Sequence, residues 1–137
     1  MDIEHQYAFN QRHYHLSPTS DGWQITYVRL EATPIHQTFS GYEAAHRAYW
    51  RRIACAILLN PRRLRGADIN GTFIALVSDT DGRVHLAQHT ESGPDSATWF
   101  TNRLTALTTW RDRCWELAHN AAYLPLLTTD PTEKEAL

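Results

Sequence analysis

Eight histidines are the side chains of this 137-residue chain best suited to binding a metal ion or transferring a proton near neutral pH. His13 and His15 are two residues apart and His85 and His89 are four apart, so each pair would share one face of a strand. Paired imidazoles suit a metal site or acid–base catalysis. A zinc site, however, needs further ligands at set spacings, and neither Cys-x-x-Cys nor His-Glu-x-x-His occurs. We therefore expect no metal and no cofactor.

The remaining reactive side chains give little support for catalysis. Cys55 and Cys114 do not make a disulfide framework, and each falls on the apolar face of an expected helix, where a thiol packs as a small apolar group. The sequence has no Gly-x-Ser-x-Gly elbow and no phosphate-binding glycine loop. Asp79 and Asp81 form an acidic pair that a hairpin turn explains. We expect a protein that is not an enzyme.

The arginines are concentrated in one segment. Six lie between residues 47 and 65 with no Asp or Glu among them, so the net charge of −2 combines +6 in this segment with −8 elsewhere. Arginine binds phosphate and carboxylate groups through paired hydrogen bonds, which suits nucleic acid or an acidic protein surface. The alternative is a solvated face that complements the helix dipole. The candidate contact residues are Arg47, Trp50, Arg51 on the expected helix and Arg62, Arg63, Arg65 in a flexible linker after it.

Five tryptophans are also unusual in a chain of this length. Two of them, Trp99 and Trp115, fall off the apolar stripe of the expected second helix, and exposed tryptophans on a terminal helix indicate a partner surface, most simply in a homodimer. The alternative is a helix that is buried over a wide face. The candidate dimer surface comprises Trp99, Trp110 and Trp115.

Alternating apolar and polar residues predict two hairpins that could position these groups. Each hairpin has an Asp-Gly pair at its turn. The residues before the first hairpin look irregular. The expected strands are residues 13–16, 23–30, 72–78 and 83–89.

Capping signals predict two helices. Ser40 and Glu43 form a capping box, so a helix should begin there and end near residue 60, before a proline. Asp95 or Ser96 would cap a long second helix. The apolar stripe of that helix comprises Phe100, Leu104, Leu107, Trp110, Cys114, Leu117 and Ala121.

These elements predict an α+β fold in which a small antiparallel sheet of two hairpins packs on one helix, in the order β-β-α-β-β, followed by a long C-terminal helix. We expect one domain over residues 1–124 and a polar tail over residues 125–137. No internal repeat of solenoid length is evident. The side chains expected to face the first helix are Trp23, Ile25, Tyr27, Phe73, Ala75 and Val77.

Several short motifs occur in a set order: His15-Leu16, Gly22-Trp23, Phe39, Glu43-Ala44, Ile53-Ala54 and Asp81-Gly82-Arg83-Val84. Through them the stretch from Tyr14 to His89 resembles a family of short uncharacterised bacterial domains in which two hairpins flank one helix. This chain differs by an insertion at residues 60–70 and by the helix after Pro94. The resemblance implies the fold and carries no assigned activity.

Length and composition limit the classes of function. The chain has the size of one domain, lacks an apolar run that could span a membrane and begins with polar residues, so we expect a cytoplasmic protein. The first hypothesis is a non-enzymatic regulator that binds nucleic acid through the arginine segment. The alternative is a protein–protein inhibitor or adaptor, of the kind that mobile elements and phages encode, using the same arginines or the tryptophans. A third is an unrecognised enzyme built on His13, His15, His85 and His89.

Overall fold

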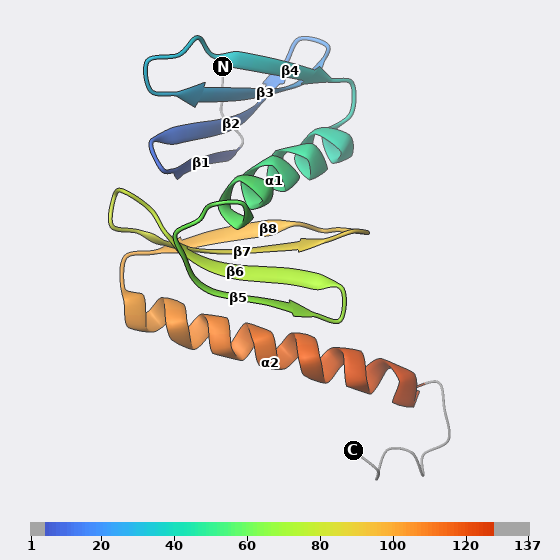
Figure 1. The fold of residues 1–137 in the computed structure, drawn as a ribbon. Coiled ribbons are helices and arrows are strands. Elements are labelled where there is room, and N and C mark those ends of the chain that lie inside the picture. The colour runs from blue at the N-terminus through green and yellow to red at the C-terminus, as the bar shows by residue number, and fades with distance from the viewer. Residues whose placement is uncertain (1–4, 128–137) are drawn as a thin grey trace.

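The computed structural model describes residues 5–127, with side chains described as far as His119. In this part of the chain, four strands and a helix occur twice in succession (Figure 1). The first unit comprises β1 (His5–Phe9), β2 (Arg12–Thr19), β3 (Gly22–Arg29), β4 (Ile35–Phe39) and α1 (Tyr42–Leu58). The second unit comprises β5 (Arg63–Ile69), β6 (Thr72–Ser78), β7 (Val84–Thr90), β8 (Ser96–Phe100) and α2 (Arg103–Leu127). Over the described range, neither helix combines the length and apolarity needed to cross a membrane.

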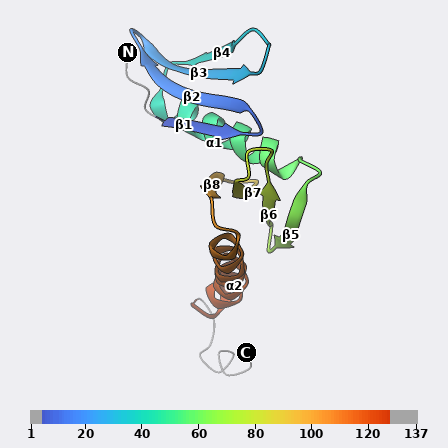
Figure 2. The ribbon, with the colours of Figure 1, turned by 90° about the vertical axis from the view of Figure 1, so that its left-hand side faces the viewer.

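Each set of four strands forms its own antiparallel sheet in chain order, sheet A from β1–β4 and sheet B from β5–β8. The layers follow one another as sheet A, α1, sheet B and α2 (Figures 1 and 2). The α+β class, the antiparallel pairing and the long C-terminal helix are thus confirmed. The two expected hairpins, however, do not join in one sheet. Each hairpin instead forms the two central strands of its own sheet, and one further strand pairs with it on either side.

The four strands that the sequence pattern missed all lie at sheet edges. In β4 four of five residues are exposed, so the alternation that marks a half-buried strand is absent. In β5 the residues Arg63 and Arg65, expected in a flexible linker, pair with Val77 and Leu76 of β6. Charged residues are common on edge strands because they prevent pairing with a further strand.

The second helix begins later than expected. Asn102 is its N-cap, because the Asn102 side-chain oxygen accepts the backbone N–H of Leu104 at 2.8 Å and of Thr105 at 3.2 Å. Residues Ser96–Phe100, expected in the helix, form β8 and pair with β7. The tryptophan at position 99 therefore belongs to sheet B.

The boundaries of the helices differ from the sequence prediction in two further ways. Gly41 is the N-cap of α1 without a side-chain hydrogen bond, so the box expected from Ser40 and Glu43 does not form. Helix α2 continues to Leu127, which makes the first residues of the expected tail helical. The other residues of the 125–137 segment lie outside the described part of the chain.

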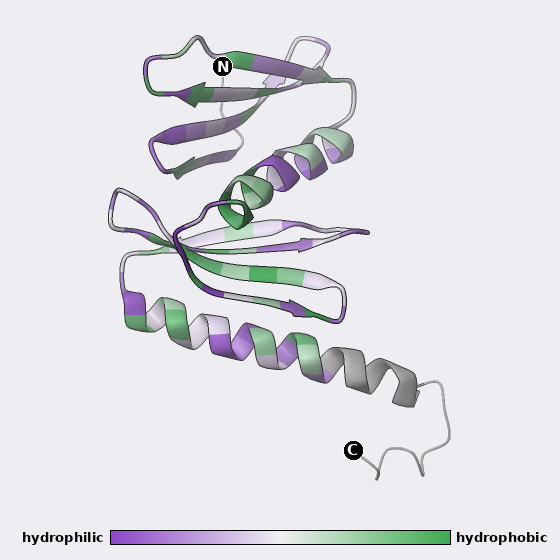
Figure 3. Ribbon diagram, viewed as in Figure 1, coloured by the Kyte–Doolittle hydropathy of each residue, from purple (hydrophilic) through white to green (hydrophobic). Residues whose placement is uncertain are grey.

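Burial explains why the strands of the two sheets have different sequence patterns. Sheet B lies between α1 and α2, so both faces of β6 are covered and residues Phe73–Val77 form a continuous apolar run (Figure 3). Within residues 5–127, α1 covers one face of sheet A, and β2 accordingly alternates between the buried Tyr14 and Leu16 and the more exposed His13 and His15. The six residues expected to face α1 all belong to the core around it, as predicted.

The two units repeat each other with nearly constant spacing. Asn70 and Leu76 lie 60 residues after Asn10 and Leu16, while Phe100 and Ala106 lie 61 residues after Phe39 and Ala45. The extra residue falls in the turn between β6 and β7: Thr19 and Gly22 bracket two residues, whereas the equivalent Asp79 and Arg83 bracket three. The period is longer than that of the solenoid repeats, and few identical residues mark it.

A buried chain of hydrogen bonds joins the two sheets. The Tyr7 hydroxyl of β1 lies 2.8 Å from His85 Nδ1 of β7, and His85 Nε2 lies 2.7 Å from Asp79 Oδ2. The other Asp79 oxygen accepts the backbone N–H of Asp81 at 2.8 Å and of Arg83 at 3.1 Å. With Asp79 ionised, His85 Nε2–H donates to the carboxylate, which leaves His85 Nδ1 to accept the Tyr7 proton.

The protonation states of this chain follow from burial and hydrogen bonding. Burial lowers the pKa of His85, and the hydrogen bond from its ring to Asp79 opposes that effect only in part. Burial alone would raise the pKa of Asp79, but the hydrogen bonds from His85 and from two backbone N–H groups bring it below its ordinary value. Neutral His85 beside ionised Asp79 is therefore the stable state at neutral pH.

We expect the free energy of unfolding to fall as the pH is lowered from about 7 to about 5. Unfolded His85 takes up a proton near its ordinary pKa of about 6.5, whereas the folded protein resists that proton until a lower pH. Each lowering of the folded pKa by one corresponds to about 1.4 kcal/mol. Urea unfolding at several pH values measures this slope, which His85→Gln should reduce. A stability that is constant over this range, or a slope unchanged in His85→Gln, would contradict the assignment.

Candidate functional site

A pocket of about 290 Å³ opens where the β1 edge of sheet A meets sheet B. We call it the seam pocket. Sheet A contributes residues of β1 and β2, and sheet B contributes one residue that precedes β7 and one from β8. Its lining residues are Gln6, Tyr7, Ala8, His13, His15, Arg83 and Trp99.

Strand register places the two histidines on the same side of sheet A, as the sequence predicts. Tyr14 and Leu16 of β2 point into the core, so His13 and His15 between them point the other way, where they pair with Ala8 and Gln6 of β1. The ring centroids of His13 and His15 are 6.5 Å apart. Both imidazoles can therefore face one ligand.

Arg83 and Trp99 form the opposite side of the seam pocket. The guanidinium carbon of Arg83 lies 4.4 Å from the centre of the Trp99 ring, a cation–π contact. The backbone of Arg83 is fixed by its hydrogen bond to the buried Asp79 carboxylate. Trp99 remains 44% exposed, so the ring offers surface to a ligand while the arginine covers another part of it.

The electrostatics of the seam pocket favour an anion. None of the described residues that line it is acidic, and Arg83 supplies a permanent positive charge. Burial lowers the pKa of His15, and the neighbouring His13 lowers it further. A bound anion would oppose both effects and draw a proton onto His15. Burial also raises the pKa of Tyr7, so its hydroxyl stays protonated and hydrogen-bonded to His85.

The structure distributes the candidate residues of the arginine segment over several places. Arg47 and Trp50 line a second pocket of about 410 Å³ between α1 and the β7–β8 loop, which we call the helix pocket. Its lining includes Glu43 and Asp95 as well as Arg47, so its charge is mixed. Arg51 donates a hydrogen bond to the backbone oxygen of Glu91 at 3.3 Å.

The arginines after α1 are held partly by the protein itself. Arg63 donates to the Leu58 backbone oxygen at 2.8 Å and covers the Phe73 ring at 5.3 Å. Arg65 donates to the backbone oxygen of Leu64, and Arg62 is exposed. Arg62, Arg63 and Arg65 therefore lie near the β5 edge of sheet B, away from the helix pocket that Arg47 lines.

The three tryptophans proposed for a dimer surface also separate. Trp99 belongs to the seam pocket, and Trp110 packs in the second core cluster between sheet B and α2. Trp115 is 64% exposed on α2 and stacks on His119, with ring centroids 4.5 Å apart. Leu104, expected to be on the buried stripe of α2, is 72% exposed, because the helix begins after β8 and turns a different face to the sheet.

His85 and His89 lie on the same face of β7, as expected, but they belong to different groups. His85 is in the buried chain with Tyr7, and His89 approaches Cys55 and Asp95. Among the described residues, Cys55, His89 and Asp95 form one group of three whose ligand atoms could hold a metal ion. Burial, and after it the charge of Asp95, raises the pKa of the Cys55 thiol, so a resting thiolate nucleophile is disfavoured.

Sequence reasoning missed Gln6, Tyr7 and Arg83 as members of a pocket. The first two lie on β1, which no clear alternation marks, and Arg83 looked like an ordinary residue after an Asp-Gly turn. On the β2 side of this pocket, the spacing of His13 and His15 was the sequence feature that indicated a shared face.

Comparison with known proteins adds no relative. The sequence matches none of the protein-family models and none of the curated proteins with which it was compared. The function is therefore inferred from the chemistry of the pockets.

Proposed function

We propose that the protein binds single-stranded nucleic acid, with one nucleotide in the seam pocket. The base stacks on Trp99, and the phosphate is bound by Arg83 together with His13 and His15. The observation that carries this proposal is the Arg83 guanidinium held 4.4 Å above an exposed tryptophan, in a pocket that two histidines and no acidic residue complete. Aromatic rings beside cationic groups are the usual means of binding single strands without sequence preference.

The open face of sheet A supports an extended ligand. Register places Gln6, His15, Thr26 and His36 in a row across β1 to β4 on the face away from α1. Thr26 Oγ1 lies 3.1 Å from His36 Nδ1, so this row carries hydrogen-bonding groups without acidic ones. A strand leaving the seam pocket could cross this face without meeting a carboxylate.

The arginine segment is less suited to be the main contact. Arg51 and Arg63 have acceptors within the protein, and Arg47 shares its pocket with two carboxylates. The alternative, a protein inhibitor or adaptor that contacts an acidic partner, would use Arg47 and Arg62, whose side chains are exposed. Both the nucleic-acid-binding proposal and the protein-binding alternative describe a binding protein and not an enzyme.

We expect a fluorescent oligothymidine to bind, and Trp99→Ala and Arg83→Gln each to weaken binding roughly 5- to 100-fold, since a stacked base contributes about 1–3 kcal/mol. Fluorescence anisotropy measures the affinity. The matched control is Arg111→Gln, which removes an exposed arginine of α2 and should leave the affinity unchanged.

Salt and pH provide further readouts of the same interaction. The log–log salt slope should be shallow, about −0.7 to −1.4 for one or two phosphates. Binding should strengthen below neutral pH as His15 gains a proton. Loss of affinity in Arg47→Gln with Arg62→Gln, but not in the two seam variants, would place the contact on the arginine segment. Absence of binding to DNA and RNA at low salt would reject this function, and a partner captured from lysate despite nuclease treatment would support the protein-binding alternative.

We also propose that the outer face of α2 mediates dimerisation. Leu104 and Trp115 are eleven residues apart, close to three helical turns, so the two exposed side chains lie on one face. Sedimentation at tens of micromolar should give twice the 15.8 kDa chain mass for the wild type and a monomer for Trp115→Ser. A wild type that sediments as a monomer would contradict this proposal.

A further inference from the structure

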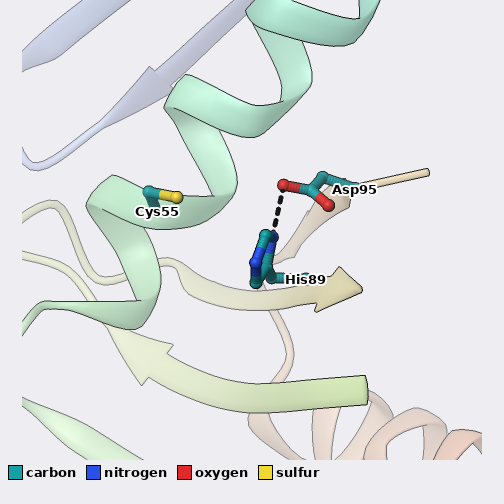
Figure 4. A group of neighbouring side chains, drawn as sticks. All are labelled: Cys55, His89 and Asp95. Carbon is teal, nitrogen blue, oxygen red and sulfur yellow. Dashed lines mark hydrogen bonds and ion pairs between the residues drawn. The ribbon is translucent and has the colours of Figure 1, made fainter. Parts of the chain in front are cut away.

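Three side chains from separate elements converge beside α1. Cys55 lies on α1, His89 on β7 and Asp95 immediately before β8, and one ligand atom of each lies within 4.8 Å of the other two (Figure 4). In Figure 4 the Cys55 sulfur points from the helix toward the His89–Asp95 pair. Sulfur, imidazole nitrogen and carboxylate oxygen are the three donor types that zinc accepts in proteins.

We propose that Cys55, His89 and Asp95 form a Zn²⁺ site. A thiolate and a carboxylate balance the charge of a divalent cation, and a thiolate ligand selects zinc over magnesium or calcium, which require oxygen ligands. The proposal is independent of nucleic-acid binding and replaces the expectation of no metal. That expectation rested on the absence of short ligand motifs, whereas these ligands are 34 and 6 residues apart along the chain.

The ligands are already oriented in the metal-free protein. His89 Nδ1 lies 2.8 Å from Asp95 Oδ2, and the other Asp95 oxygen accepts the Thr90 backbone N–H at 3.3 Å. A cation that displaces the proton shared by these two atoms can bind both His89 Nδ1 and Asp95 Oδ2. The Asp95 side chain is only 3% exposed, so burial holds its carboxylate in place as a ligand.

Solvent can reach the remaining coordination position. Asp95 lines the helix pocket of about 410 Å³ as well as the metal group, so the site borders an open space. Three protein ligands and one open position are typical of zinc sites that bind water or a further ligand.

Arg51 is the group that competes with the metal. Its Nε lies 3.7 Å from Asp95 Oδ2, and its side chain is 49% exposed. The guanidinium therefore balances the carboxylate while no metal is bound, and it can move into solvent when a cation arrives. Removing this charge should tighten zinc binding.

The repeated architecture does not require these residue types. With the 61-residue spacing of the later elements, the positions equivalent to Cys55, His89 and Asp95 are Glu116, Val28 and Pro34. The two units therefore share a fold but not this donor set.

Cobalt titration of the full-length protein tests the site. Co²⁺ should bind one per chain and give a thiolate-to-cobalt charge-transfer band, which Zn²⁺ displaces. Cys55→Ser should abolish the band, while Cys114→Ser, which removes the other half-buried cysteine, should leave it unchanged. Asp95→Asn should weaken binding at least tenfold, because it removes a charged ligand and loss of an outer-shell carboxylate alone costs that much. Arg51→Gln should strengthen it.

Alkylation of the wild-type protein gives a test without mutation. Zn²⁺ should slow the reaction of iodoacetamide with Cys55, measured by mass spectrometry of each cysteine, and leave the rate at Cys114 unchanged. The proposal is wrong if wild-type protein gives no charge-transfer band, if the band persists in Cys55→Ser, or if Zn²⁺ protects both cysteines equally or neither.

Discussion

The burial of α1 between two sheets is the constraint on which the rest of the structure depends. In the described part of the chain, α1 is the element that covers the apolar face of sheet A, and one face of sheet B rests on the same helix. Tyr49, Ile53 and Ile57 are fully buried in this shared core, so separating the sheets would expose the helix on both sides. Both pockets and the metal group lie at the margins of this layer.

Buried polar side chains at the edge of this shared core hold sheet A and sheet B in a fixed relation. Tyr7 of sheet A can reach His85 of sheet B only across the shared core, and Asp79 completes the chain from the hairpin turn. No described buried side-chain nitrogen or oxygen lacks a hydrogen-bond partner. Since an unpaired buried polar group costs about 1–3 kcal/mol, the network specifies how the sheets meet. It also sets the backbone of Arg83, and with it one wall of the seam pocket.

The apolar pattern of the central strands made them predictable from the sequence, whereas the edge strands lack a clear pattern. The central strands bury at least one face and therefore keep an apolar pattern, alternating in β2 and continuous in β6, whereas the edge strand β4 exposes most of its residues and has no such pattern. The same distinction limits prediction of the sites. The pairs at 13 and 15 and at 85 and 89 could be placed on shared faces from spacing alone. Their partners Arg83, Trp99, Cys55 and Asp95 come from other elements, which only the packing of the layers brings near.

The internal repetition also shows how the outer face of sheet A differs from the equivalent face of sheet B. Ala87 and Ala97 of sheet B are buried against α1, and their small size lets the helix approach. The equivalent positions in sheet A, 61 residues earlier, are Thr26 and His36, which hydrogen-bond to each other on the outer face. A polar outer face of this kind is what terminal repeats of stacked proteins use to remain solvated. A helix packed on this face would bury those groups without replacing their contacts with water, so its polar residues favour solvent or a polar ligand over an apolar cover.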